Sequence, residues 1–277
     1  MHPILLTIFG FPIHSYGVML AVSFIVGIWL AIARAKKAGL KSEIISDVSF
    51  WVIISSLVGA RLYYVILKFG EFKGHLLNIV NPFQEGALGI GGLVMYGGFI
   101  GAILAGFVFF RLKKLPFLPY ADAFAPSIGI GIFFTRIGCF LNGCCFGAPS
   151  DICSVSFPVD SPAGVYQEAM HASGLLPSQL FESAGGLVIA AVLLIIGRKK
   201  TFPGFQFYLM GLFYAILRFA IDLTRFYPPN ERIGFFSHNQ VLCIVFFGIF
   251  LALLISGYQR RVRQRGSSVI QNGKMEA

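Results

Sequence analysis

A positive charge inside an apolar segment is the feature of this sequence that points most directly to chemistry. Arg136 lies near the end of the hydrophobic stretch 128–141. A charged residue at the centre of a membrane helix costs about 2.5–3.5 kcal/mol on insertion scales, unless an anion or water receives it. Arginine, unlike lysine, keeps its charge and offers a planar fork that binds phosphate oxygens in pairs. Arg136 is therefore predicted to bind an anion, and phosphate suits it best.

The arginines in or beside apolar segments form a set of four: Arg61, Arg136, Arg218 and Arg225. The spacing of Arg218, Asp222 and Arg225, at i, i+4 and i+7, predicts one helix face on which Asp222 pairs with either arginine. In a structural alternative, Asp122, Glu182 and Asp222 only neutralise the arginines so that the bundle can insert. Three carboxylates do not cancel four arginines, so the charge count favours an anionic ligand.

A glycine-rich stretch, 89–101, is the second signal. Its small residues let another helix, or a lipid headgroup, approach the backbone closely. Tyr96 lies at its centre, where it also fits an interfacial aromatic residue. A packing face between helices is the ordinary explanation of such a stretch, so it adds weight only beside the arginines.

Five cysteines leave two structural readings open. Four of them, Cys139, Cys144, Cys145 and Cys153, lie at or near one predicted membrane face, and Cys243 lies inside a predicted helix. Adjacent cysteines with no local histidine make a poor zinc pattern, so no metal site is predicted. A structural disulfide or inert buried thiols remain as the alternatives.

The elements that must position these residues are membrane helices. The chain has 277 residues, of which 56% are hydrophobic and 12% charged, against about a quarter charged in soluble domains. Its mean hydropathy is +0.78. Apolar windows long enough to span a bilayer predict seven transmembrane helices. They lie at about 17–33, 47–67, 88–110, 119–141, 180–197, 204–224 and 238–258.

Basic residues predict the orientation of these helices, because short loops rich in Lys and Arg stay in the cytoplasm. Clusters follow the first, third, fifth and seventh helices and hold 15 of the 22 basic residues. The N-terminus is therefore predicted outside and the C-terminus inside. Residues 1–258 form one membrane domain with an external head at about 142–179, and 259–277 form a polar, disordered cytoplasmic tail. The net charge of +10 is spread along these edges, which fits membrane lipids and not nucleic acid.

The run RIGCFLNG at residues 136–143 resembles the hallmark motif of the bacterial prolipoprotein diacylglyceryl transferases, with Thr135 in place of its leading glycine. Further matches follow in the family's order along most of the chain. They are Tyr16-Gly17, Gly59-Ala60-Arg61, residues 122–126, residues 177–182 and the Arg218-to-Arg225 segment. The resemblance implies an all-α, seven-helix inner-membrane protein with a periplasmic N-terminus, a cytoplasmic C-terminus and a small periplasmic head.

The same resemblance implies a transferase. The diacylglyceryl group of phosphatidylglycerol would move to the lipobox cysteine thiol in the signal peptide of a preprolipoprotein, forming a thioether and releasing glycerol phosphate. This is the first step of bacterial lipoprotein maturation. Its partners would be phosphatidylglycerol, those signal peptides and the surrounding membrane lipids, with the active site towards the periplasm. No cofactor is expected.

The resemblance also suggests roles for single residues. Arg136 is expected to bind the headgroup and Arg218 to stabilise the developing phosphate charge, so both are catalytic candidates, together with Tyr96. Asn142 is expected to hydrogen-bond the headgroup. The expected binding set is completed by Gly97, Gly98, Tyr16, Arg61, Glu182, Asp222 and Arg225. Among these, the two carboxylates would hold the arginines in place.

The chain departs from the family pattern at two positions. Tyr96 stands where many members have histidine, and Cys144 where many have an acidic residue after Asn-Gly. A tyrosine of ordinary pKa near 10 is a poor base, so Tyr96 either has nearby arginines to lower its pKa or only orients substrate. A diverged paralogue with altered activity is one alternative. A transporter of an anionic solute is the other, although the inverted repeats expected of one are not visible in the sequence.

Overall fold

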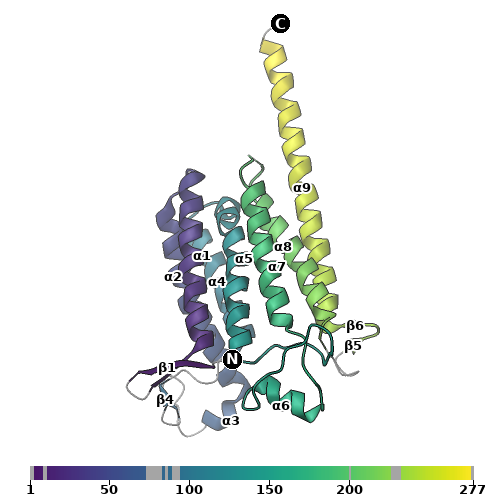
Figure 1. The fold of residues 1–277 in the computed structure, drawn as a ribbon. Coiled ribbons are helices and arrows are strands. Elements are labelled where there is room, and N and C mark those ends of the chain that lie inside the picture. Colours follow the sequence, from purple (N-terminus) through teal and green to yellow (C-terminus); the bar gives the residue numbers. More distant parts are fainter. Residues whose placement is uncertain are drawn as a thin grey trace. The chain divides into compact units, whose positions relative to one another are not determined.

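The fold is that of a multi-pass, all-helical membrane protein (Figure 1). The computed structural model describes residues 3–8, 11–72, 83–84, 87–88, 94–199, 201–225 and 232–275. Within these ranges, six helices are long and apolar enough to cross a membrane. They are α1 (Ser15–Lys37), α2 (Ser42–Leu67), α5 (Phe117–Leu141), α7 (Ser178–Ile196), α8 (Phe205–Asp222) and α9 (His238–Met275).

The predicted span at 88–110 corresponds to a shorter helix. Helix α4 (Met95–Leu112) has a described apolar part, Gly97–Leu112, that falls below the length of the other spans. Residues 89–93 of the predicted span, and of the glycine-rich stretch, lie outside the described ranges. The described residues thus support six spans, and the seventh stays a prediction.

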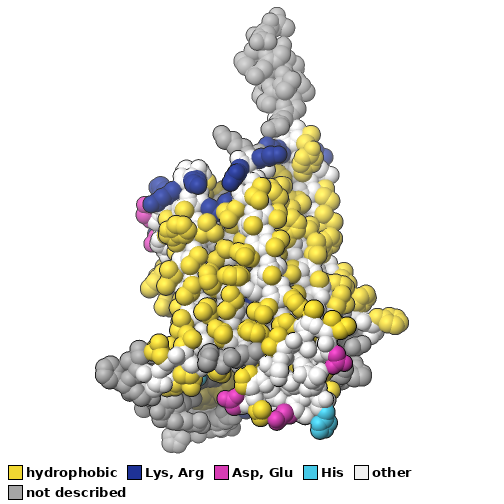
Figure 2. Space-filling model, viewed as in Figure 1, with side chains coloured by type: hydrophobic (Ala, Val, Ile, Leu, Met, Phe, Trp, Pro, Cys, Tyr) yellow, Lys and Arg dark blue, Asp and Glu magenta, His cyan; other side chains and the backbone are white. Residues whose placement is uncertain are grey.

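Apolar side chains cover the sides of the helices (Figure 2). Trp29, Trp51, Phe107 and Val188 are each more than half exposed, as lipid-facing residues would be. Lys and Arg side chains lie at helix ends in the same view, away from the apolar sides. This distribution is what a bilayer requires of a spanning bundle.

The short elements precede α1 or lie between the long helices. They are α3 (Phe69–Phe72), α6 (Pro162–Ala169), β1 (Ile4–Ile8), β2 (Phe11–His14), β3 (Phe83–Gln84), β4 (Ala87–Leu88), β5 (Arg232–Ile233) and β6 (Phe236–Ser237). Strands β3 and β4 pair antiparallel, as do β5 and β6.

The predicted disordered tail is helical. Helix α9 continues through the polar residues after 258 and ends at Met275. Arginine and glutamine, which are frequent there, are good helix formers, so a polar composition alone did not exclude a helix. The disorder prediction was therefore wrong for 259–275.

The chain forms two compact units. The second consists of residues 7–12 and 35–117, and its main contact joins α2 and α4. A Cβ atom added to Gly97 would overlap the carbonyl oxygen of Gly59, and one added to Gly98 would lie 3.1 Å from Ser56 Oγ. The glycines of α4 therefore let two helix backbones touch, as the packing alternative expected.

The first unit consists of residues 1–6, 13–34 and 118–277. Its buried core joins α5, α7 and α8 through Ala125, Ile189, Leu193 and Met210. Helices α5 and α7 approach closely, because a Cβ on Gly129 would lie 2.7 Å from the carbonyl oxygen of Gly186. This core holds the helices that carry Arg136, Glu182 and Arg218.

The loop after α5 is folded around its own small core of Phe157, Ala163 and Leu175. Ser161 begins α6 by accepting a hydrogen bond from the backbone N–H of Gly164 at 3.0 Å. The backbone N–H of Ala163 donates to the carbonyl of Gly143 at 3.0 Å, which ties this head to the end of α5.

Candidate functional site

Arg136 on α5 forms an ion pair with Glu182 on α7. Its Nη2 lies 2.9 Å from Glu182 Oε1, within hydrogen-bond distance. The Glu182 side chain is fully buried, whereas the Arg136 side chain is 20% exposed. A buried carboxylate needs a partner of opposite charge, and Arg136 supplies it.

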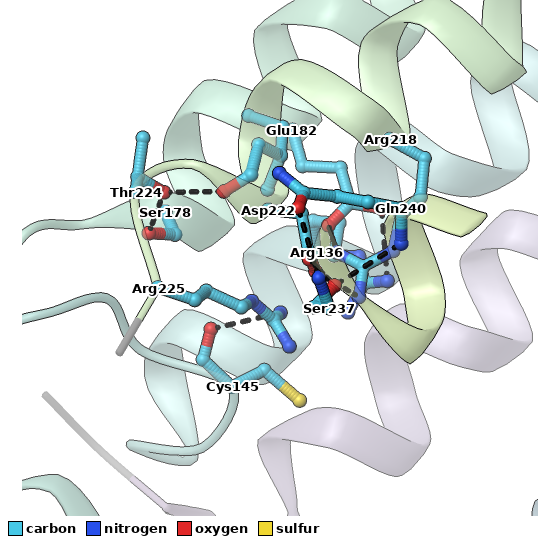
Figure 3. Close-up of polar contacts among 11 residues, drawn as sticks. Arg136, Cys145, Ser178, Glu182, Arg218, Asp222, Thr224, Arg225, Ser237 and Gln240 are labelled. Atoms are coloured by element: carbon cyan, nitrogen blue, oxygen red, sulfur yellow. Dashed lines mark hydrogen bonds and ion pairs between the residues drawn. The ribbon is translucent and has the colours of Figure 1, made fainter. Parts of the chain in front are cut away.

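Arg218 on α8 joins the same carboxylate from another side (Figure 3). Its Nη1 lies 3.6 Å from Glu182 Oε2, and its Nη2 lies 3.6 Å from Asp222 Oδ1. Both distances are longer than that of a good hydrogen bond between charged groups. Glu182 Oε2 and Arg218 Nη1 are buried and have no hydrogen-bond partner in the described structure. Two guanidinium groups thus converge on one carboxylate that binds only the first of them closely.

Asp222 is held by the start of α9. Ser237 Oγ donates to Asp222 Oδ2 and accepts from the backbone N–H of Gln240 at 3.1 Å. Gln240 Oε1 in turn accepts from the backbone N–H of Ser237 at 3.0 Å. This reciprocal pair is a capping box at the N-terminus of α9. Sequence reasoning missed both residues, although a Ser-x-x-Gln pattern before an apolar run marks such a box.

The prediction for Arg225 was wrong in its geometry. Helix α8 ends at Asp222, so Arg225 does not share a helical face with Arg218 and Asp222. Its Nη2 instead donates to the carbonyl of Cys145 at 3.2 Å (Figure 3). Arg225 therefore binds the loop that follows α5.

The hydrogen bonds of Asp122 are with the backbone at the start of α8 and not with the arginines that meet at Glu182. Its two carboxylate oxygens accept from the backbone N–H groups of Gly204, at 2.7 Å, and Phe207, at 2.9 Å. It caps the N-terminus of α8, where a negative charge is stabilised. Of the three carboxylates in the neutralising alternative, only Glu182 and Asp222 meet the arginines. The cluster of Arg136, Arg218, Glu182 and Asp222 is formally neutral, so an anion must compete with Glu182 for these arginines.

Asn142 and Tyr16 both contact Gly138, two residues after Arg136 on α5. Asn142 follows the last residue of α5, and its backbone N–H donates to the carbonyl of Gly138 at 3.0 Å. Tyr16 lies at the start of α1 and is 37% exposed. A Cβ on Gly138 would lie 3.3 Å from Tyr16 Cα, so α1 and α5 are in close contact at that point.

Gln179 is a further residue whose role the sequence reasoning did not assign. Its side chain is fully buried, and its Nε2 donates to the carbonyl of Cys144 at 2.8 Å. The amide thereby joins α7 to the loop after α5, three residues before Glu182.

All five cysteines are free thiols, so the disulfide alternative is not borne out, and two of the thiols, Cys139 and Cys243, are buried. The sulfur atoms of Cys139, Cys144 and Cys145 all lie within 4.8 Å of one another. The pKa of Cys145 is lowered, because its thiolate accepts hydrogen bonds from Cys139 and Cys144 and lies near the positive charges of Arg136 and Arg225.

Comparisons with known proteins identify the family. A family model described as Prolipoprotein diacylglyceryl transferase matches residues 3–256. The chain belongs to the prolipoprotein diacylglyceryl transferase family.

Relatives in several bacteria carry the name Phosphatidylglycerol--prolipoprotein diacylglyceryl transferase. The protein of Clostridium novyi (strain NT) is 32% identical over 260 residues, which cover 92% of this chain and 95% of the relative. That of Listeria innocua serovar 6a (strain ATCC BAA-680 / CLIP 11262) is 31% identical over 265 residues, 95% and 91% of the two chains. That of Nitratidesulfovibrio vulgaris (strain DSM 19637 / Miyazaki F) is 32% identical over 263 residues, 91% and 92%.

The remaining predicted site residues lie in the second unit. Arg61 is 9% exposed, and its guanidinium lies 5.6 Å from the ring centroid of Tyr64 and 5.4 Å from that of Phe72. Gly97 and Gly98 pack against α2, which accounts for their small size without a substrate. Tyr96 is the second residue of α4, but its side chain lies outside the described part of the structure.

Proposed function

We propose that this protein transfers the diacylglyceryl group of phosphatidylglycerol to the lipobox cysteine thiol of preprolipoproteins. The sulfur attacks the glyceryl carbon that bears the phosphate, a C–S bond forms, and the C–O bond to the phosphate breaks. The product is a thioether, and glycerol phosphate leaves. The thiol proton passes to a base or to the leaving phosphate.

The observation that carries this proposal is the convergence of Arg136 and Arg218 on Glu182, in a chain that matches the family from residue 3 to 256. A phosphodiester has one negative charge, and the leaving phosphomonoester gains more. Arg136 binds the headgroup phosphate, and Arg218 stabilises the charge that develops on it.

The long contacts of Arg218 suit this role. Its two ion pairs, each at 3.6 Å, leave the guanidinium able to turn towards a phosphate without breaking a close hydrogen bond. Glu182 and Asp222 hold the two arginines near the reacting atoms before substrate arrives. Such preorganised groups cost little reorganisation when the charge develops.

Other residues complete the proposed site. Asn142 hydrogen-bonds the headgroup, Tyr16 lines the site, and Arg225 fixes the adjoining loop through Cys145. By resemblance to the family, Arg61, Gly97 and Gly98 are assigned to lipid binding and Tyr96 to handling the proton. The aromatic rings beside Arg61 favour a charged side chain that is held in place.

The proposed setting is the bacterial inner membrane, with the active site towards the periplasm. Seven helices place the N-terminus in the periplasm, the head at 142–179 beside it, and the C-terminus in the cytoplasm. The distribution of Lys and Arg supports this orientation. Membrane lipids surround the helices, and the lipobox signal peptide enters from the bilayer.

The test measures transfer of labelled diacylglyceryl from phosphatidylglycerol to a lipobox peptide in detergent. Arg136→Ala is expected to lower transfer by about 100-fold or more, as does loss of one preorganised donor in other enzymes. Arg111→Ala is the control, because Arg111 contacts the ring of Phe107 and is exposed. Tyr96→Phe reports whether the tyrosine hydroxyl takes part. No transfer by the wild type, or full transfer by Arg136→Ala, would contradict the proposal.

A further inference from the structure

Three thiols of one short segment are gathered beside the arginine cluster. Cys139 is buried in the last turn of α5, Cys144 is partly buried, and Cys145 is exposed. Their sulfur atoms lie within 4.8 Å of one another. The proposed transfer reaction assigns them no role, because its thiol belongs to the substrate.

The ending of α5 brings the first two thiols together. The backbone N–H of Cys144 donates to the carbonyl of Cys139 at 3.0 Å, and that of Gly143 donates to the carbonyl of Phe140 at 3.1 Å. Gly143 has a φ of +68°. These are the two hydrogen bonds and the left-handed residue of a Schellman motif, in which the residue after the glycine contacts the residue five positions earlier. Here both contacting side chains are cysteines.

Cys145 completes the cluster through an uncommon backbone conformation. Its φ is +62°, in the left-handed region that few residues other than glycine adopt. Two contacts hold this loop in place: Arg225 binds the carbonyl of Cys145, and Gln179 binds that of Cys144. Such local strain persists only where the surroundings fix it, and it is concentrated at functional sites.

We propose that Cys139, Cys144 and Cys145 bind one thiophilic divalent metal ion of the Zn²⁺ class. Zn–S bonds of about 2.3 Å place the sulfurs of a tetrahedral site about 3.8 Å apart, a small contraction of this cluster. The three sulfurs bind the ion as thiolates, and the protons still held by the thiols are released to solvent on binding. Three thiolates and a divalent ion carry a net charge of −1, which the nearby Arg136 and Arg225 stabilise.

The fourth position of this site is open. Among the residues that the structure describes, no histidine or carboxylate joins the three sulfurs. Water or a small external ligand would fill that position, as in metal sites with three protein ligands. The bound ion would lie beside Arg136, whose Nη1 is 4.0 Å from Cys139 Sγ.

Three nearby sulfurs favour a metal over a disulfide. A disulfide would join two of them and leave the third unused, and one between the adjacent Cys144 and Cys145 would be strained. Soft thiolates select Zn²⁺ and related ions over hard cations. The metal proposal therefore uses the whole cluster, and it does not depend on the transferase reaction.

The test uses Cd²⁺ as the probe on the full-length protein, reduced and then freed of reductant in detergent. Wild type is expected to retain one Cd²⁺ per chain after desalting and to show thiolate-to-metal charge-transfer absorption. Cys145→Ser and Cys144→Ser are expected to weaken Cd²⁺ binding at least about tenfold, as loss of a supporting group at a metal site does elsewhere. Because Cys139 is buried, its substitution would alter packing as well as metal binding, so the test uses only Cys144 and Cys145.

The matched control is the Cys153→Ser/Cys243→Ser double variant, which keeps the cluster and removes the other two thiols. It is expected to bind Cd²⁺ like wild type. Three outcomes would overturn the proposal: no Cd²⁺ retained by wild type, unchanged binding in the Cys144→Ser/Cys145→Ser double variant, or binding lost in the control. Because Cd²⁺ binding is measured without lipid or peptide, its result can be interpreted even if the transfer assay fails.

Discussion

Helix α5 takes part in two polar clusters whose carboxylates differ in how well their oxygens are satisfied. Near its start, both oxygens of Asp122 accept backbone hydrogen bonds at 2.7 and 2.9 Å. In the same region Arg34 donates to Gln206 at 2.5 Å. Near its end, Glu182 has one close contact with Arg136 and one long contact with Arg218.

The difference separates a structural cluster from a candidate binding site. A carboxylate whose two oxygens each accept a close backbone hydrogen bond is satisfied by the fold and needs no ligand. A carboxylate shared by two arginines at unequal distances leaves buried donors that a phosphate group can satisfy. Residue types alone do not distinguish the two clusters, because both contain arginine and a carboxylate.

Glu182→Gln, in the cluster near the end of α5, is expected to have the largest effect on transfer. The neutral amide does not hold two guanidinium groups, so transfer per folded molecule should fall about 100-fold, the scale of a lost preorganised interaction. The measurement is the initial rate at saturating phosphatidylglycerol, normalised to the folded fraction. Activity equal to wild type would place Glu182 outside the reaction.

Asp122→Ala should show the opposite pattern. Loss of the acceptors for Gly204 and Phe207 should lower the free energy of unfolding by about 1–2 kcal/mol, as removal of a helix cap does. Transfer per folded molecule should stay within about twofold of wild type, since no substrate contact is lost. Thermal unfolding in detergent provides the measurement, and Asp122→Asn, which keeps one acceptor, is the control. A large loss of activity without a loss of stability would contradict the difference proposed here between the Asp122 cluster and the Glu182 cluster.

Ser237→Ala should affect both properties moderately. It removes the N-cap of α9 and the hydroxyl that holds Asp222, which should cost about 1 kcal/mol of stability. Transfer should fall about fivefold, because Asp222 then positions Arg218 less well. Ser237→Thr keeps the hydroxyl and should restore both values. If alanine and threonine give the same activity, the capping box does not act on the site.

Arg225→Ala should have the smallest effect. Its described hydrogen bond reaches the carbonyl of Cys145, and a single bond of this kind contributes about 0.5–1.5 kcal/mol. Transfer should fall about threefold, while Arg225→Lys should show whether charge alone is enough. A loss as large as that of Glu182→Gln would show that Arg225 contacts the reacting phosphate.

Local patterns predicted the parts of the molecule that depend on neighbouring residues in the chain. Apolar windows located the six described spans, and the i, i+4 spacing correctly placed Arg218 beside Asp222. The pairing of Arg136 with Glu182 joins residues 46 positions apart, and no spacing rule fixes it. It depends on the packing of α5 against α7.

The errors have physical causes as well. The predicted face for Arg225 assumed that the helix continued, whereas α8 ends at Asp222. The cysteine cluster depends on a left-handed turn at Gly143, and the Asn-Gly pair there was read only as a family motif. The charge count set three carboxylates against four arginines, although one of the three, Asp122, is bound to the start of α8.

The hydroxyl of Ser237 fixes the direction of a hydrogen-bond chain. It has one proton, and it accepts from the N–H of Gln240, so its own proton goes to Asp222. Asp222 must then present an acceptor oxygen on that side while its other oxygen faces Arg218. Donation thus runs from the first turn of α9 to Asp222, and the guanidinium of Arg218 faces the same carboxylate as a donor from the other side. A rotation of that turn would take the Ser237 hydroxyl away from Asp222 and remove one of the groups that hold the carboxylate facing Arg218.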